Sequence, residues 1–237
     1  MRWLLFILFL LTYTSCLLAQ PGFGPEVGIG MSSMHFAPAI GFTSASGSSI
    51  FSARIGSIAD FSLNKKIYFQ PGIFLSRRGQ SREFSFYTSD SLNVSVQQTL
   101  TINYIDVPVN VIYKTGMQGK GRIIFGLGVT PSYIIGGRNK RYSHGAINDT
   151  PFTNNFNRQI VYRDPVAMFD FGVNIITGYE LPTGLFFRAY YTAGMRDIGL
   201  SGEIDKNRIW GISAGYIFGK GRNINNEVDD LIDKSSN

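Results

Sequence analysis

The stretch that decides the fold is residues 103–114, which reads NYIDVPVNVIYK. Apolar and polar residues alternate along this stretch with a period of two. In an extended chain one side would carry Ile105, Val107, Val109, Val111 and Tyr113. The other side would be polar except for one isoleucine, and would carry Tyr104, Asp106, Pro108, Asn110, Ile112 and Lys114. This alternation predicts a β-strand with one apolar face and one largely polar face.

The same alternation recurs in seven other segments, so strands are expected at residues 27–32, 51–60, 67–78, 103–114, 123–133, 169–179, 185–192 and 210–218. Long polar stretches at 33–48, 79–96, 137–163 and 193–207 alternate with short turns at 63–66, 115–121 and 182–184. This order predicts an all-β fold, an eight-stranded antiparallel up-and-down barrel. Pro71 and Pro108 fall inside expected strands, where each predicts a bulge or a position at the rim.

The composition favours a barrel that spans a membrane. Aromatic residues make up 14% of the 237 residues and charged residues only 16%, and glycine is frequent at 27 residues. A soluble barrel would bury its apolar face and expose charges. Here the apolar faces are almost free of charge over about ten residues per strand, the length that a tilted strand needs to cross a bilayer. We therefore expect a transmembrane barrel of the outer membrane, with long loops outside the cell and with short turns and both termini in the periplasm.

The two ends of the chain lie outside the expected barrel, which we place at residues 20–218. Residues 1–19 begin with the basic Arg2, continue with an apolar run and end at the small residue Ala19, which predicts a signal peptide. The alternative is a lipoprotein signal in which Cys16 becomes the acylated N-terminus. Residues 219–237 are expected to form a periplasmic tail, in which apolar residues at helical spacing from Ile224 to Ile232 predict a short helix.

Several motifs resemble one family, the PorT-type outer-membrane β-barrel proteins of Bacteroidetes. The resemblance covers nearly the whole chain after the signal and rests on the sequences GIG at 28–30, LNKKIYFQP at 63–71, NYIDVP at 103–108, FDFG at 169–172 and GYIF at 215–218. It implies an eight-stranded barrel domain. It also implies a link to protein secretion across the outer membrane, because the family is named after a component needed for that process.

The expected inward face carries four acids and four bases that are far apart in the sequence. They are Glu26, Arg54, Asp60, Arg78, Asp106, Lys114, Asp170 and Arg188. The interior of an eight-stranded barrel is just wide enough for side chains to fill. We therefore predict a lumenal charge network that plugs the barrel, and the alternative is a narrow ion pathway along the same charges.

The polar stretch at 137–163 is a candidate contact surface outside the cell. It carries five bases, namely Arg138, Lys140, Arg141, Arg158 and Arg163. These bases could contact lipopolysaccharide phosphates or a protein partner, and the alternative is a solvated loop without a ligand. No stripe of Lys and Arg points to nucleic acid.

Catalysis and cofactor binding have little support in the sequence. The two histidines, His35 and His144, fall in expected outer loops, and no spacing joins a nucleophile to a base and an orienting group. No ligand cluster for a metal and no phosphate-binding glycine loop is present, so no cofactor is expected. The first hypothesis is therefore a non-enzymatic structural or assembly component that binds outer-membrane lipid and a secretion or periplasmic partner. The second is a small porin-like channel or carrier, and the third is a lipid-modifying enzyme.

Overall fold

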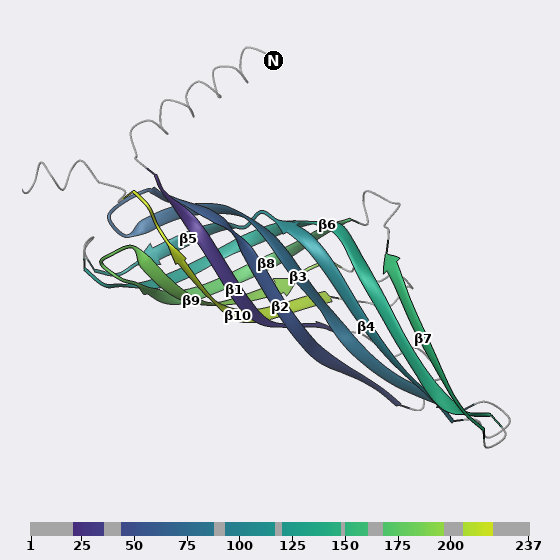
Figure 1. Cartoon of the computed structure of the whole chain (residues 1–237). Coiled ribbons are helices and arrows are strands. Elements are labelled where there is room, and N and C mark those ends of the chain that lie inside the picture. Colours follow the sequence, from purple (N-terminus) through teal and green to yellow (C-terminus); the bar gives the residue numbers. More distant parts are fainter. Residues whose placement is uncertain are drawn as a thin grey trace, which may run out of the picture.

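The computed structural model describes residues 21–35, 44–87, 93–116, 120–147, 150–160, 168–196 and 206–219 (Figure 1). Within them lie ten strand segments: β1 (Gly22–His35), β2 (Ser44–Ser62), β3 (Ile67–Tyr87), β4 (Asn93–Asp106), β5 (Val109–Lys114), β6 (Arg122–Ile147), β7 (Thr150–Ile160), β8 (Phe169–Glu180), β9 (Leu185–Gly194) and β10 (Lys206–Tyr216). No helix long and apolar enough to cross a membrane occurs among these residues. The expected signal peptide and all but the first residue of the expected tail lie outside the described residues.

The segments form a closed ring of eight antiparallel strands, which confirms the predicted barrel. β1 pairs with both β2 and β10, so the first and last strands close the ring. β4 and β5 act as one strand, because both pair with β3 and with β6. β7 lies outside the ring and pairs with β6. The expected short turns are present between β2 and β3 and between β8 and β9, and both ends of the described chain lie at the same end of the barrel as these turns (Figure 1).

The two prolines lie side by side and mark neither a bulge nor the rim, the two features predicted for them, because the ladder of β3 continues on both sides of them. Pro71 is paired with Val109, and the next amide, Gly72 N–H, donates to the carbonyl of Pro108 over 2.9 Å. The same register continues from β4 into β5, so the prolines remove ladder donors without shifting the strand. The register shifts of the ring lie elsewhere, after Ser49 on β2 and at Asn103 on β4.

The ring has an apolar outer face, as the opening stretch predicted, and an inner face on which polar and apolar side chains are mixed. Along β5 the side chains of Asn110, Ile112 and Lys114 are at most 3% exposed, whereas Val111 is 53% exposed. Exposed aromatic side chains occur at both ends of the apolar face. Among them are Phe23, Tyr113, Tyr179, Tyr216 and Phe218 toward the end with the short turns, and Tyr133, Phe169, Tyr191 and Trp210 toward the other. Further exposed aromatic side chains on this face are Phe51, Phe69, Phe125, Phe171 and Phe187. Two aromatic girdles around an apolar band are typical of a barrel in a bilayer.

Four strands continue past the ring as an open sheet, which we call the blade. It comprises residues 44–49 of β2, 79–87 of β3, 93–101 of β4, 137–147 of β6, and the whole of β7 (Figure 1). β8 pairs with β6 only as far as Tyr133, and from Gly137 onward β7 takes its place. The predicted loops at 33–48, 79–96 and 137–163 are therefore partly wrong, because much of each is strand. Outside a membrane both faces of a sheet can be wet, so no apolar alternation marks the strand.

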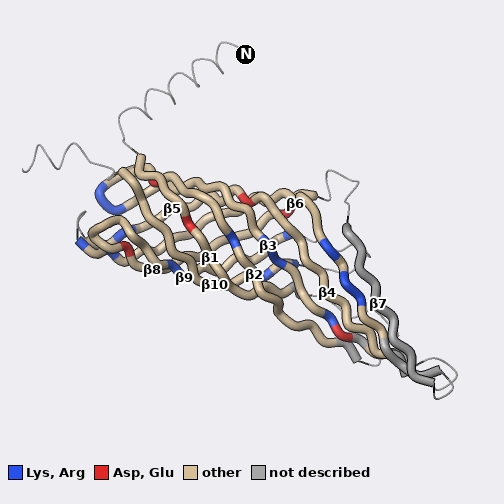
Figure 2. The backbone as a smooth tube through the Cα atoms, in the orientation of Figure 1, with Lys and Arg blue, Asp and Glu red and all other residues tan. Residues whose placement is uncertain are grey.

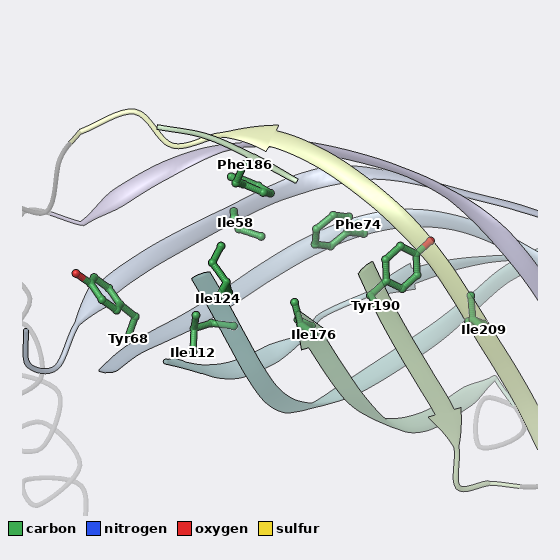
Figure 3. Close-up of a cluster of buried hydrophobic side chains, with 9 residues drawn as sticks. All are labelled: Ile58, Tyr68, Phe74, Ile112, Ile124, Ile176, Phe186, Tyr190 and Ile209. Carbon is green, nitrogen blue, oxygen red and sulfur yellow. The ribbon is translucent and has the colours of Figure 1, made fainter. Parts of the chain in front are cut away.

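The lumen also holds an apolar cluster, which was not expected from the polar inward faces. Nine buried side chains from most strands of the ring meet there (Figure 3): Ile58, Tyr68, Phe74, Ile112, Ile124, Ile176, Phe186, Tyr190 and Ile209. A second, smaller cluster of Ile102, Tyr104 and Ile134 lies near the base of the blade. Side chains from facing strands thus fill the lumen as the core of a soluble protein would be filled.

Candidate functional site

The candidate site is a set of charged residues on the strands of the ring whose side chains point into the lumen; Figure 2 colours the charged positions along the backbone. The structure places all eight charges proposed from the sequence on the inner face, seven of them buried and Arg54 partly so. They come from β1, β2, β3, β4, β5, β8 and β9. Each occupies an inward position of the period-2 pattern, which explains why residues far apart in the sequence share one space.

One group of charges surrounds Glu26 on β1. This carboxylate pairs with Arg54 on the neighbouring strand and, at 3.3 Å, with Arg188 Nη1 on β9. Arg188 Nη1 also donates to Gln70 Oε1 on β3 over 2.7 Å. Since β3 and β9 are not adjacent strands, this bond crosses the lumen.

A second group is centred on Lys114, the last residue of β5, and is joined to the first through Gln70. The Gln70 amide donates to Asp60 Oδ1 over 2.9 Å. Lys114 Nζ, which is fully buried, pairs with Asp60 and lies 2.8 Å from Glu180 Oε2. Glu180 also pairs with Arg122. An unbroken chain of polar contacts therefore leads from Arg54 on β2 to the mouth of the barrel at the end with the short turns.

Sequence reasoning missed Arg122 and Glu180. They are the first residue of β6 and the last residue of β8, and they face each other across that strand pair. Extending the inward positions of each strand by two residues leads to both. The period-2 pattern could therefore have identified them.

A third group of charges lies nearer the blade. Arg78 pairs with Asp106, which also accepts a hydrogen bond of 2.6 Å from Ser76 Oγ. The Arg78 guanidinium lies 4.0 Å from the centre of the Tyr104 ring. Asp170 is reached through Asn207 on β10, whose amide donates to the carboxylate over 2.8 Å and to the Tyr104 hydroxyl over 3.1 Å.

The described lumenal charges balance. Five bases, Arg54, Arg78, Lys114, Arg122 and Arg188, face five acids, Glu26, Asp60, Asp106, Asp170 and Glu180. Ring contacts add to the ion pairs, because the Arg54 guanidinium lies 3.6 Å from the centre of the Tyr190 ring and the Arg188 guanidinium 4.0 Å from that of Phe186. Removing one partner of such a buried pair leaves an uncompensated charge and costs about 3–5 kcal/mol.

Two cavities between these described side chains are small. One cavity inside the ring, between Arg54, Arg78 and Asp106, has a volume of about 30 Å³. Another, between Glu26, Asn110 and Arg188, has about 10 Å³. Each has room for about one water molecule. A larger hollow of about 210 Å³ lies at the end with the short turns, where Arg122 and Glu180 line its floor.

The second candidate site, the basic stretch at 137–163, is divided by the structure. Arg138, Lys140 and Arg141 have exposed side chains on β6 in the blade. Arg158 is part of β7, and Arg163 lies outside the described residues. The expected loop is therefore wrong at Arg138, Lys140 and Arg141, which lie in a strand, and Arg141 faces the opposite side of the sheet from the other two.

The two histidines lie in strands and not in the loops expected for them. His35 ends β1 and pairs with Lys206, and His144 is part of β6 and pairs with Ser95. Among the described residues no group of three or more His, Cys, Asp or Glu side chains could hold a metal ion.

Comparison with known proteins agrees with this architecture. Residues 19–200 match the family described as outer membrane protein beta-barrel domain. The chain belongs to this family. It is therefore an integral outer-membrane protein. A search of curated proteins finds no match.

Several outer-membrane proteins of known structure are similar to this protein. The attachment invasion locus protein Ail of Yersinia pestis is 13% identical, with a TM-score of 0.39 over 84% of this chain and 99% of that chain. Neisserial surface protein A is 11% identical, with a TM-score of 0.37 over 83% of this chain and 97% of that chain. OprG from Pseudomonas aeruginosa is 11% identical, with a TM-score of 0.35 over 84% of this chain and 97% of that chain.

Proposed function

We propose that this protein is a non-conducting, non-enzymatic barrel that anchors the blade outside the cell as a docking surface for a partner. In this orientation the short turns and both termini are periplasmic. The observation that carries the proposal is the filled lumen, in which balanced ion pairs and an apolar cluster meet between facing strands. A partner would therefore bind the outer surface, and among the described residues the blade extends from the ring as a sheet of five strand segments.

The filled lumen argues against the porin-like alternative. A hydrated ion would have to pass between Arg188 and Gln70 and between Lys114 and Glu180, so buried pairs would have to open. Opening a buried pair without a replacement partner costs several kcal/mol. The enzyme alternative is left out of this proposal because no spacing in the sequence joins a nucleophile to a base and an orienting group. The resemblance to PorT-type proteins supports a secretion assembly as the setting.

The conductance of the purified protein tests the proposal. In a planar bilayer the refolded wild-type barrel should give little steady current, with a general porin as the positive control. Electrophoretic mobility before and after boiling shows that the sample is folded. A stable current in the wild type that is abolished by Asp106→Ala would support the channel and contradict the proposal.

A shortened blade tests the docking role. Ser81 and Thr99 are paired residues on β3 and β4, and their hydroxyls lie 3.2 Å apart. Replacing residues 82–98 by Asn-Gly would therefore close the hairpin with a two-residue turn and leave the ring intact. Proteins cross-linked to the wild-type barrel in its own membrane should be lost from this variant. An unchanged set of cross-linked proteins would count against docking on this hairpin.

A further inference from the structure

The charges on the outside of the barrel have one predominant sign. Of the six acids in the described residues, five are buried in the lumen and only Glu83 is exposed. Three outward-facing bases, in contrast, occur where the apolar face of β3, β4 and β6 gives way to the blade. They are Arg77, Arg138 and Lys140, whose side chains are exposed, and we call them the basic strip.

The register of the sheet puts these bases on three successive rows. Leu75, Ile105 and Tyr133 form the last apolar row across β3, β4 and β6. Arg77 lies one row further on, opposite Asn103, and Arg138 lies on the next row, opposite Thr101. Lys140 follows opposite Thr99. Rows on one face of a strand are about 7 Å apart, so the basic strip extends about 20 Å along the strands from the apolar band.

The basic strip is not neutralised by its neighbours across the strands. The residues opposite its three bases on the described strands are neutral: Ala53 and Asn103 beside Arg77, Thr101 and Gln159 beside Arg138, and Thr99 and Asn157 beside Lys140. The row after Lys140 contains Glu83, Gln97 and Tyr142, so an acid marks the far end of the strip. The strip can therefore attract an anion from outside the protein.

We propose that the basic strip binds the phosphorylated head group of a glycolipid in the outer leaflet, whose acyl chains lie against the apolar face below. A phosphate accepts charge-assisted hydrogen bonds from arginine and lysine. Leu75 and Ile135, both more than half exposed, lie just below the strip, so one amphiphile can contact both regions. A soluble anion would use only the bases. The proposal rests on the blade being outside the cell, as proposed above.

Binding to the purified full-length chain in detergent micelles tests the proposal. The probe is a diphosphorylated lipid A, compared with its dephosphorylated form and with the deacylated head group. The wild type should bind the intact phosphorylated lipid much more tightly than either comparison compound. Arg77→Gln/Arg138→Gln/Lys140→Gln should weaken that binding by roughly 100-fold, the loss expected for three bases near a charged lipid surface. Arg77→Lys/Arg138→Lys should keep most of it.

The matched control removes three bases from the opposite end of the barrel. Lys65→Gln/Lys66→Gln/Lys120→Gln makes the same change in net charge, is confined to the end with the short turns, and should leave binding unchanged. Equal loss in the control would mean that only total charge matters, and equal binding of the dephosphorylated lipid would mean that phosphate is not recognised. Equal binding of the deacylated head group would show a soluble-anion site. Each of these results overturns the proposal, and none depends on the conductance of the lumen.

Discussion

Lys114 forms ion pairs with two acids of the lumen. Its ammonium group is fully buried and pairs with both Asp60 and Glu180. Lys114→Met keeps a long unbranched side chain but leaves both carboxylates without this partner. The free energy of unfolding should fall by about 3–5 kcal/mol, measured by urea titration in lipid vesicles. The exposed Lys120 is the control, since Lys120→Met should change it by at most about 0.5 kcal/mol. A similar effect in the two variants would mean that the lumen is wet.

Two inward-facing glycines of β6, Gly126 and Gly128, make room for atoms of the neighbouring strand β5. A Cβ at Gly126 would lie 2.4 Å from the Cδ1 atom of Ile112, and one at Gly128 would lie 2.3 Å from the carbonyl oxygen of Val109. Gly126→Ala and Gly128→Ala should each destabilise the barrel by about 1–3 kcal/mol. Ile112→Val removes the first clash but not the second. In that background the cost of Gly126→Ala should fall and the cost of Gly128→Ala should remain, and equal rescue of both would contradict this packing.

At the scale of single residues the period-2 pattern identified most of the lumenal charges. It failed for Arg122 and Glu180 because both are next to a turn, where a polar residue is expected whichever way it points. It also could not state the partners. Arg188 on β9 meets Gln70 on β3 only because the ring closes with a particular register, and no local pattern specifies that register.

The strand formed by β4 and β5 runs from the apolar band of the ring into the blade. Val109 on β5 faces outward near the middle of the apolar band. Gln97 on β4 faces outward too, but lies in the blade. Val109→Arg should therefore destabilise the barrel by about 2–4 kcal/mol. Gln97→Arg should cost at most about 0.5 kcal/mol. Folding yields in vesicles over a urea gradient give both values, and equal costs would place the blade inside the bilayer.

The strands of the ring could be predicted from the sequence and the blade could not. In the ring a lipid-facing apolar side chain alternates with an inward one that is polar at most positions of residues 105–114, Ile112 being the exception. In the blade Thr99, Thr101 and Asn103 face outward where the ring has Ile105, so both faces are polar and the chain resembles a loop. The sequence therefore indicates where the strands leave the membrane, but not where they end.

The orientation of the whole molecule can be tested by labelling intact cells. The blade and the short turns lie at opposite ends of the barrel (Figure 1), and the proposed function puts the blade outside. A membrane-impermeant maleimide should label Glu83→Cys and should not label Lys65→Cys until the outer membrane is permeabilised. Labelling of Lys65→Cys alone would reverse the orientation.

The central claim is that the apolar face meets lipid and the charged face closes the lumen. A cysteine scan from Ile105 to Lys114, one position at a time, with a fluorescent probe on each thiol, tests it most directly. Lipid-borne quenchers should reduce the fluorescence at Ile105, Val107, Val109, Val111 and Tyr113. In the folded barrel the thiols at Asn110 and Ile112 should resist attachment of the probe, because these positions are buried in a filled lumen. Quenching by lipid at Asn110 but not at Val109 would contradict the register, and strong aqueous quenching at Asn110 and Ile112 would contradict the plug.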